Sequence, residues 1–227
     1  MADHTLSGDP PVPLILRRSA RARRISLRVS ALDGRVTLTL PPKVRDREAL
    51  AFAEEKAGWI RSHLAKHPPP VTVQIGAVVP VEGRNRRVVA ASGRGITLSD
   101  AEVAVPPASP GRSLQRYLKE LARDRLAEAS DRYAERLGRP YTRLTIRDTR
   151  SRWGSCTADG GLMYSWRLIM APPGVLHYVA AHEVAHLSEM NHSPAFWAQV
   201  GRLYGDYAAP REWLKTSGSV LHRVTFG

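Results

Sequence analysis

The segment AAHEVAHLSEMNHSPAFW, residues 180–197, decides the fold predicted for this chain. On a helix, residues four apart lie one turn apart on the same face, so the imidazoles of His182 and His186 can converge on one metal ion. Glu183 points about 100° away from His182 around the helix axis. That direction suits a carboxylate that acts on water at the metal better than a metal ligand. The segment therefore predicts a metal-binding helix.

The third metal ligand must come from outside this helical turn. A catalytic zinc ion needs three protein ligands and one open position. His192 is the nearest candidate, but an unbroken helix would place it about 9 Å further along the axis than His186. The chain must therefore turn back, and both Asn191, which can adopt a left-handed conformation, and the helix-start signal Ser193-Pro194 permit a turn. The rival third ligands are Glu189 and Glu212.

The helix that carries the motif is predicted to span about 174–189 and to follow the pair Pro172-Pro173. Its apolar residues surround the motif, so the site would lie in the protein interior. Three unpaired histidines would be costly there, and a bound metal accounts for them. The apolar residues are Val175, Leu176, Val179, Val184 and Leu187.

The region before this helix predicts a long helix and a small sheet. Leucines and tyrosines at helical spacing form one apolar face over 113–137, and Gly138 ends that helix. A strand follows over 142–148. Residues 151–170 predict a hairpin that turns at an Asp-Gly-Gly sequence.

The N-terminal half of the chain predicts short strands and one helix. Residues 1–13 carry three prolines and no apolar periodicity, which favours a flexible leader. Alternating apolar residues predict strands over 23–30 and 34–41, joined by a tight turn at Asp33-Gly34.

The next segments hold a helix and two candidate boundaries. A helical stripe covers 46–66 and stops before the triple proline 68–70. Short apolar runs separated by turn residues over 71–105 predict a small β-meander. The sequence PPASPG, residues 106–111, then separates this region from the long helix.

The composition indicates a globular protein with an excess of positive charge. The chain has 227 residues, of which 43% are hydrophobic and 24% charged. The 34 Lys and Arg against 21 Asp and Glu give a formal charge of +13, which favours anionic partners. The single cysteine agrees with a reducing compartment. Because no bilayer-spanning stretch and no signal-peptide pattern occurs, we expect a cytoplasmic protein.

An arginine cluster near the N-terminus leaves a second function open. Its members could contact nucleic acid, but no aromatic residues interleave to stack bases, so a solvated strand edge also explains it. The cluster comprises Arg17, Arg18, Arg21, Arg23 and Arg24.

Three further residues have ordinary structural interpretations. Cys156 is expected to be a small apolar residue on a strand, although it could bind metal or act as a redox switch. His177 lies roughly 140° around the helix from His182 and is expected to face away from the metal. Tyr178, one turn before His182, is expected to pack in the core or to support the site.

The C-terminal motifs resemble one known family. They are RWGSC (152–156), WRLIMAPP (166–173), YVAAHEVAHLSEMNHSPAFW (178–197) and LYGDYAAPREWLK (203–215). The histidine spacing also matches the metzincin proteases, but Glu189 stands where their turn has glycine. The context resembles the YgjP-like zinc metallopeptidases, which are related to the SprT-like group. The resemblance runs from about residue 16 to 217, with Gly205 in place of a frequent proline.

This resemblance implies a zincin core. In it, His182, His186 and His192 bind zinc, and Glu183 is the general base and acid. It also implies that residues 150–156 and the strand 162–170 lie beside the site. That strand could hold a substrate peptide in extended form.

We therefore expect an α+β protein. Its parts are a flexible leader (1–13), an N-terminal β-rich region with one helix (14–107) and a zincin-like helix-sheet-helix metallopeptidase domain (108–227). The expected function is zinc-dependent hydrolysis of peptide bonds by water that Glu183 activates at the metal. The alternatives are a nucleic-acid-associated binding protein with a structural or vestigial zinc site, and a zinc hydrolase of a non-peptide amide.

Overall fold

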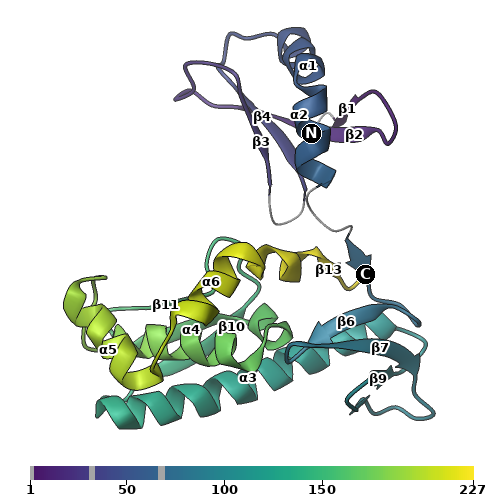
Figure 1. Cartoon of the computed structure of the whole chain (residues 1–227). Coiled ribbons are helices and arrows are strands. Elements are labelled where there is room, and N and C mark those ends of the chain that lie inside the picture. The colour runs from purple at the N-terminus through teal and green to yellow at the C-terminus, as the bar shows by residue number, and fades with distance from the viewer. Residues whose placement is uncertain (1–2, 31–33, 66–69) are drawn as a thin grey trace. The chain divides into compact units, whose positions relative to one another are not determined.

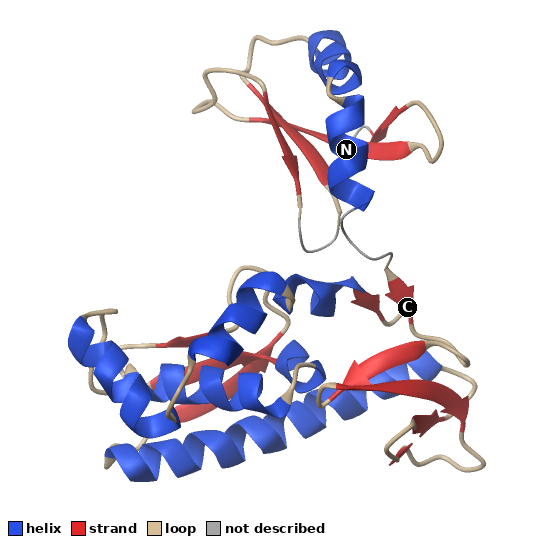
Figure 2. Ribbon diagram, in the orientation of Figure 1, coloured by secondary structure: helices blue, strands red, loops and turns tan. Residues whose placement is uncertain are grey.

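The computed structural model describes residues 3–30, 34–65 and 70–227. The chain divides into two compact units, Met1–Pro69 and Pro70–Gly227. Each unit combines helices with small sheets (Figure 2), which confirms the α+β class. Among the described residues, no helix is both long and apolar enough to span a membrane.

The first unit is a four-stranded sheet with helices packed on its core face. The strands lie in the order β1-β2-β4-β3, with β2 and β4 parallel and the other pairs antiparallel. Leu14 and Leu38 of the sheet and Ala53 and Ile60 of the helices are buried in one core. The elements are β1 (Asp3–Leu6), β2 (Val12–Arg18), β3 (Ser26–Val29), β4 (Val36–Leu40), α1 (Asp46–Glu55) and α2 (Ala57–Ala65).

Two expectations for this unit were wrong. The expected leader 1–13 instead contributes β1 and the start of β2, because Leu6 and Val12 are buried in the core. The intervening prolines obscured the alternating pattern. The expected single helix is interrupted at Lys56, just before Gly58, a weak helix former. The predicted turn at Asp33 and the triple proline fall partly or wholly outside the described residues.

A long helix packs along the core of the second unit. Helix α3 (Pro110–Leu137) ends at Gly138, as predicted. Gly138 has a left-handed φ of 71°, which glycine adopts easily because it has no Cβ atom. In Figure 1, α3 runs the length of this unit, from the β6–β9 sheet to α5 (Pro194–Tyr204). Leu114, Leu118 and Leu126 of this helix are buried in the core of the unit.

The sheet before α3 belongs to the second unit and is not a meander. It comprises β6 (Val78–Val81), β7 (Arg84–Ala90), β8 (Thr97–Leu98) and β9 (Glu102–Val105). Its order is β6-β7-β9-β8, and β7 pairs with β9 in parallel. Separately, β5 (Val71–Thr72) pairs with β13 (Val224–Thr225).

The unit boundary therefore lies at 69/70, where we expected 107/108. The buried valines of β6, β7 and β9 share the core of α3. The β6–β7 turn also docks tightly, because the Glu82 amide donates to Ile169 O at 2.7 Å. A Cβ on Gly83 would lie 2.8 Å from the Cα of Pro172. The PPASPG segment is thus a short connection inside one unit.

A three-stranded sheet lies next to the helix that carries the motif. Its strands are β10 (Arg143–Arg147), β11 (Gly154–Cys156) and β12 (Gly161–Ser165), in the order β10-β12-β11. Strand β12 is central and β11 is an edge strand, antiparallel to it as the predicted hairpin requires.

The strand expected over 162–170 ends at Ser165. Residues Trp166–Met170 form the 3₁₀ helix η1 instead, and all five are buried. Arg167 pairs with Asp148 at 2.7 Å and donates to Leu221 O and Val224 O at 2.8 and 3.0 Å. These contacts turn the chain out of the sheet and attach it to the C-terminal segment.

The remaining helices are the one that carries the motif and those that follow it. They are α4 (Pro173–Ala185), α5 (Pro194–Tyr204), α6 (Ala208–Thr216) and the 3₁₀ helix η2 (Gly218–Arg223). Helix α4 packs on α3 and contacts α5, α6 and β11. The motif helix is therefore surrounded by packed elements.

Candidate metal centre and active site

Helix α4 ends earlier than predicted, which starts the chain reversal. Its last residue is Ala185, with His186 as the cap, where the sequence predicted an end near 189. The Glu189 amide donates to Ala185 O at 3.1 Å, and this closes a tight turn after the helix. The reversal required for His192 therefore begins directly after the motif.

Side-chain caps complete the reversal. Asn191 Oδ1 accepts a hydrogen bond from the Ser193 amide at 3.2 Å, and Ser193 Oγ accepts from the Phe196 amide at 3.3 Å. Among the described non-glycine residues only Glu82 has a positive φ. Asn191 thus acts through its side chain and not through the left-handed backbone conformation that the sequence permitted.

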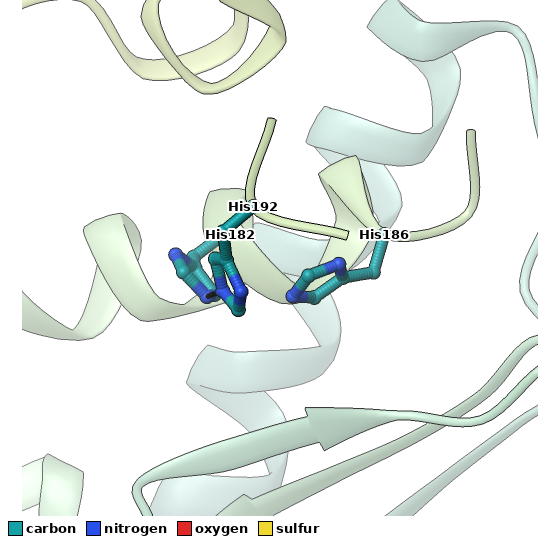
Figure 3. Close-up of side chains that lie close together, drawn as sticks. All are labelled: His182, His186 and His192. Carbon is teal, nitrogen blue, oxygen red and sulfur yellow. Dashed lines mark hydrogen bonds between the residues drawn. The ribbon is translucent and has the colours of Figure 1, made fainter. Parts of the chain in front are cut away.

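The reversal brings three imidazoles together. Ligand-capable nitrogens of His182, His186 and His192 all lie within 4.8 Å of one another. The Nε2 atoms of His182 and His192 are 3.1 Å apart, and Figure 3 shows the three rings converging. Two nitrogens bound to one tetrahedral zinc at 2.0–2.1 Å would be about 3.3 Å apart. The spacing of His182 and His192 fits a small tetrahedral metal ion, and His186 lies close enough to be its third ligand.

The protonation of the cluster also fits a metal. Burial, with smaller effects of the neighbouring histidines and Arg211, lowers the pKa of His182 to about 3. Burial likewise lowers the pKa of His186. His186 Nδ1 lies 2.9 Å from Glu189 O, so a proton on Nδ1 leaves the lone pair on Nε2 free. Neutral imidazoles are the form that binds metal.

The carboxylate of Glu183 lies beside the cluster in a buried position. Glu183 is only 6% exposed. Burial raises the pKa of this carboxyl to about 8, and the charge of Arg152 partly opposes that rise. Such a carboxyl can take up and release a proton near neutral pH.

Strand β11 comes unusually close to this carboxylate. A Cβ atom on Gly154 would lie 2.5 Å from Oε1 and 2.6 Å from Cγ of Glu183. Only glycine leaves room for the glutamate at this approach. The backbone of β11 therefore forms one wall of the site.

A cleft of about 460 Å³ opens over these groups. Its lining includes Arg152, the residues of β11, the three histidines and Glu183. The cleft joins the motif of α4 to the edge of the three-stranded sheet.

Among the described residues, the rival third ligands Glu189 and Glu212 are not part of the histidine cluster. Glu189 contacts His186 through its backbone carbonyl. Glu212 pairs with Lys215 at 3.3 Å. Cys156 lines the cleft, but burial, followed by the charges of Glu183 and Asp159, raises the pKa of its thiol to about 11. A thiol with this pKa stays protonated at neutral pH and is a poor metal ligand.

The two neighbouring aromatic positions differ in role. His177 lies in a separate hollow with Glu82 and Arg125, away from the histidine cluster, as predicted. The Tyr178 ring lies 6.0 Å from the His182 ring and stacks on Tyr207. Tyr178 therefore packs between His182 and Tyr207.

A family model for the YgjP-like metallopeptidase domain matches residues 23–217 of this chain. The chain belongs to the YgjP-like metallopeptidase family. No curated protein matches it. A solved structure, the metallopeptidase zymogen abylysin of Pyrococcus abyssi, shares 19% identity over 40% of this chain and 94% of its own, with a TM-score of 0.36.

Two residues of this YgjP-like site were not predicted individually. Gly154 and Arg152 lie in the quoted RWGSC motif, but no local pattern indicated that they face Glu183. Their position depends on how β11 packs against α4. Glycine inside a short strand is the one signal that could have suggested a close approach.

Replacing His192 with alanine is expected to lower the zinc affinity of this YgjP-like chain by about 100-fold or more, because one of the three candidate ligands would be lost. Competition with a chromogenic chelator measures the affinity. His177→Ala on the same helix is the matched control and should bind zinc like the wild type. Unchanged affinity of the His192 variant would return Glu189 or Glu212 to consideration.

Proposed function

We propose that this YgjP-like protein is a zinc-dependent peptidase that hydrolyses peptide bonds. His182, His186 and His192 would hold the zinc, and Glu183 would be the general base and acid. The observation that carries this proposal is the convergence of three imidazoles within 4.8 Å in the cleft that also contains Glu183. Family membership supports peptidase chemistry.

The histidines and the glutamate have separate tasks in this mechanism. A zinc ion held by the three histidines would act as a Lewis acid toward the substrate carbonyl and would lower the pKa of water. Glu183 takes a proton from the attacking water and then transfers it to the leaving amine. A cation beside Glu183 favours its ionised form, so the carboxylate is ready to accept that proton.

The substrate peptide is better placed on β11 than on β12. Strand β12, which the sequence favoured, already has β10 and β11 on its two sides. Strand β11 has one unpaired edge within the described sheet and lines the cleft. An extended peptide adding to this edge would pass Gly154 and Glu183.

Metal removal tests the proposal. Dialysis against a chelator is expected to reduce cleavage of casein or a fluorogenic peptide to background, and added zinc should restore it. The purified protein should contain about one zinc per chain by elemental analysis. Activity that survives complete metal removal would contradict the proposal.

The alternative function rests on the first unit. Arg17, Arg21, Arg23 and Arg24 are exposed, while Arg18 pairs with Asp46 at 2.5 Å. Four exposed guanidinium groups could contact phosphates and leave the metal site structural or vestigial. This alternative predicts salt-sensitive nucleic-acid binding that does not depend on Glu183.

A further inference from the structure

A positively charged side chain lines the cleft two residues before β11. Arg152 is exposed and lines the cleft together with Glu183 and the histidines. Other arginines of this unit form ion pairs, as Arg143 does with Asp159 at 2.7 Å. Arg152 forms no side-chain hydrogen bond or ion pair within the described ranges.

The described lining of the cleft offers this arginine no exposed carboxylate. Glu183 is the one carboxylate among the described lining residues, and it is nine-tenths hidden from solvent. Its carboxyl is assigned to proton transfer. The exposed surface of the cleft therefore favours an anionic ligand.

Arg152 lies near the path proposed for the substrate peptide along the edge of β11. Arg152 precedes Gly154 by two residues, and Gly154 is the point where β11 touches Glu183. Two residues of a bound, extended peptide also span about 7 Å. In a peptide that lies along the β11 edge, a side chain or terminus within about two residues of the scissile bond would therefore reach the guanidinium of Arg152.

We propose that Arg152 is a specificity residue that binds a carboxylate of the peptide substrate within about two residues of the scissile bond. The carboxylate is an Asp or Glu side chain or a free C-terminus. A guanidinium binds either in the same bidentate geometry. This inference rests on the proposed peptidase function and names its substrate class.

Two peptide series separate the two sources of the carboxylate. In the first, amidated fluorogenic peptides carry Asp or Asn at each of three positions on either side of the scissile bond. In the second, neutral peptides end in a free acid or an amide one to three residues after it. The wild type is expected to prefer one carboxylate position by about 10-fold or more in kcat/KM.

Charge variants then test the residue. Arg152→Gln should reduce that preference to within about twofold, mainly through KM, and Arg152→Glu should favour Lys at the same position. Arg147→Gln, at the end of the other edge strand of the same sheet, is the matched control and should keep the wild-type preference. Equal losses for all peptides in Arg152→Gln, or no charge preference in the wild type, would overturn the proposal.

Peptide binding separates this inference from the proposed function. Fluorescence anisotropy of labelled acidic and neutral peptides is measured with Glu183→Gln protein, with and without Arg152→Gln. Tighter binding of the acidic peptide that requires Arg152, without cleavage by the wild type, would uphold the carboxylate site and refute the peptidase. Cleavage without Arg152-dependent binding or preference would do the reverse.

Discussion

Glu183→Gln is expected to lower the rate of peptide hydrolysis by about 10²–10⁴-fold while zinc remains bound. Glutamine has nearly the shape of glutamate but cannot accept and return the proton. The metal should stay because its three proposed ligands are the histidines, which the change does not touch. Initial rates on a fluorogenic peptide and zinc content per chain measure the two effects.

The matched control for this variant is Glu189→Gln. It makes the same chemical change six residues away, where the backbone carbonyl and not the carboxylate contacts His186. Rate and zinc content should both stay close to wild type. Equal activity of the Glu183 variant would refute the peptidase mechanism, and salt-sensitive nucleic-acid binding untouched by it would support the alternative function.

Gly154→Ala is expected to lower the hydrolysis rate by about 100-fold, because a displacement of roughly 1 Å at a catalytic group has an effect of this size. The new methyl group would overlap the Glu183 carboxylate, whose Oε1 lies 2.5 Å from the position of that Cβ. Zinc content should be retained. The overlap should also lower the free energy of unfolding by about 1–3 kcal/mol, as overpacking does.

A double variant shows whether this effect acts through Glu183. In the Glu183→Ala background the overlapping carboxylate is absent, so Gly154→Ala should change the melting temperature much less. Gly201→Ala in α5, where a Cβ meets nothing within 4 Å, is the matched control. The same loss of melting temperature in both backgrounds would show that Gly154 meets something other than Glu183.

Local patterns predicted those parts of the fold that depend on near neighbours in sequence. The apolar face and the terminal glycine of α3 identified a 28-residue helix to within three residues at its start. The β11–β12 hairpin and the start of α5 at Ser193-Pro194 were predicted in the same way. In each case the signal and the structure lie within a few residues of each other.

Expectations were wrong where long-range pairing decided the outcome. The parallel pairing of β7 with β9 cannot be distinguished from a meander by alternation alone. The segment Trp166–Met170 looked like a strand continuation, but the Arg167 contacts to Asp148 and to the C-terminal segment redirect it. Residues 3–13 looked like a leader because the burial of Leu6 depends on helices more than forty residues away.

The sequence by itself determined that His182 and His186 share one helix face with Glu183 between them, because helical periodicity is a local property of the chain. Only the tertiary structure decided the return of His192 to within 3.1 Å of His182, the burial of Glu183 and the approach of β11 at Gly154. These three features depend on packing between α4, α5 and the sheet. Burial in turn sets the pKa of Glu183 and leaves Arg152 as the exposed charge of the cleft.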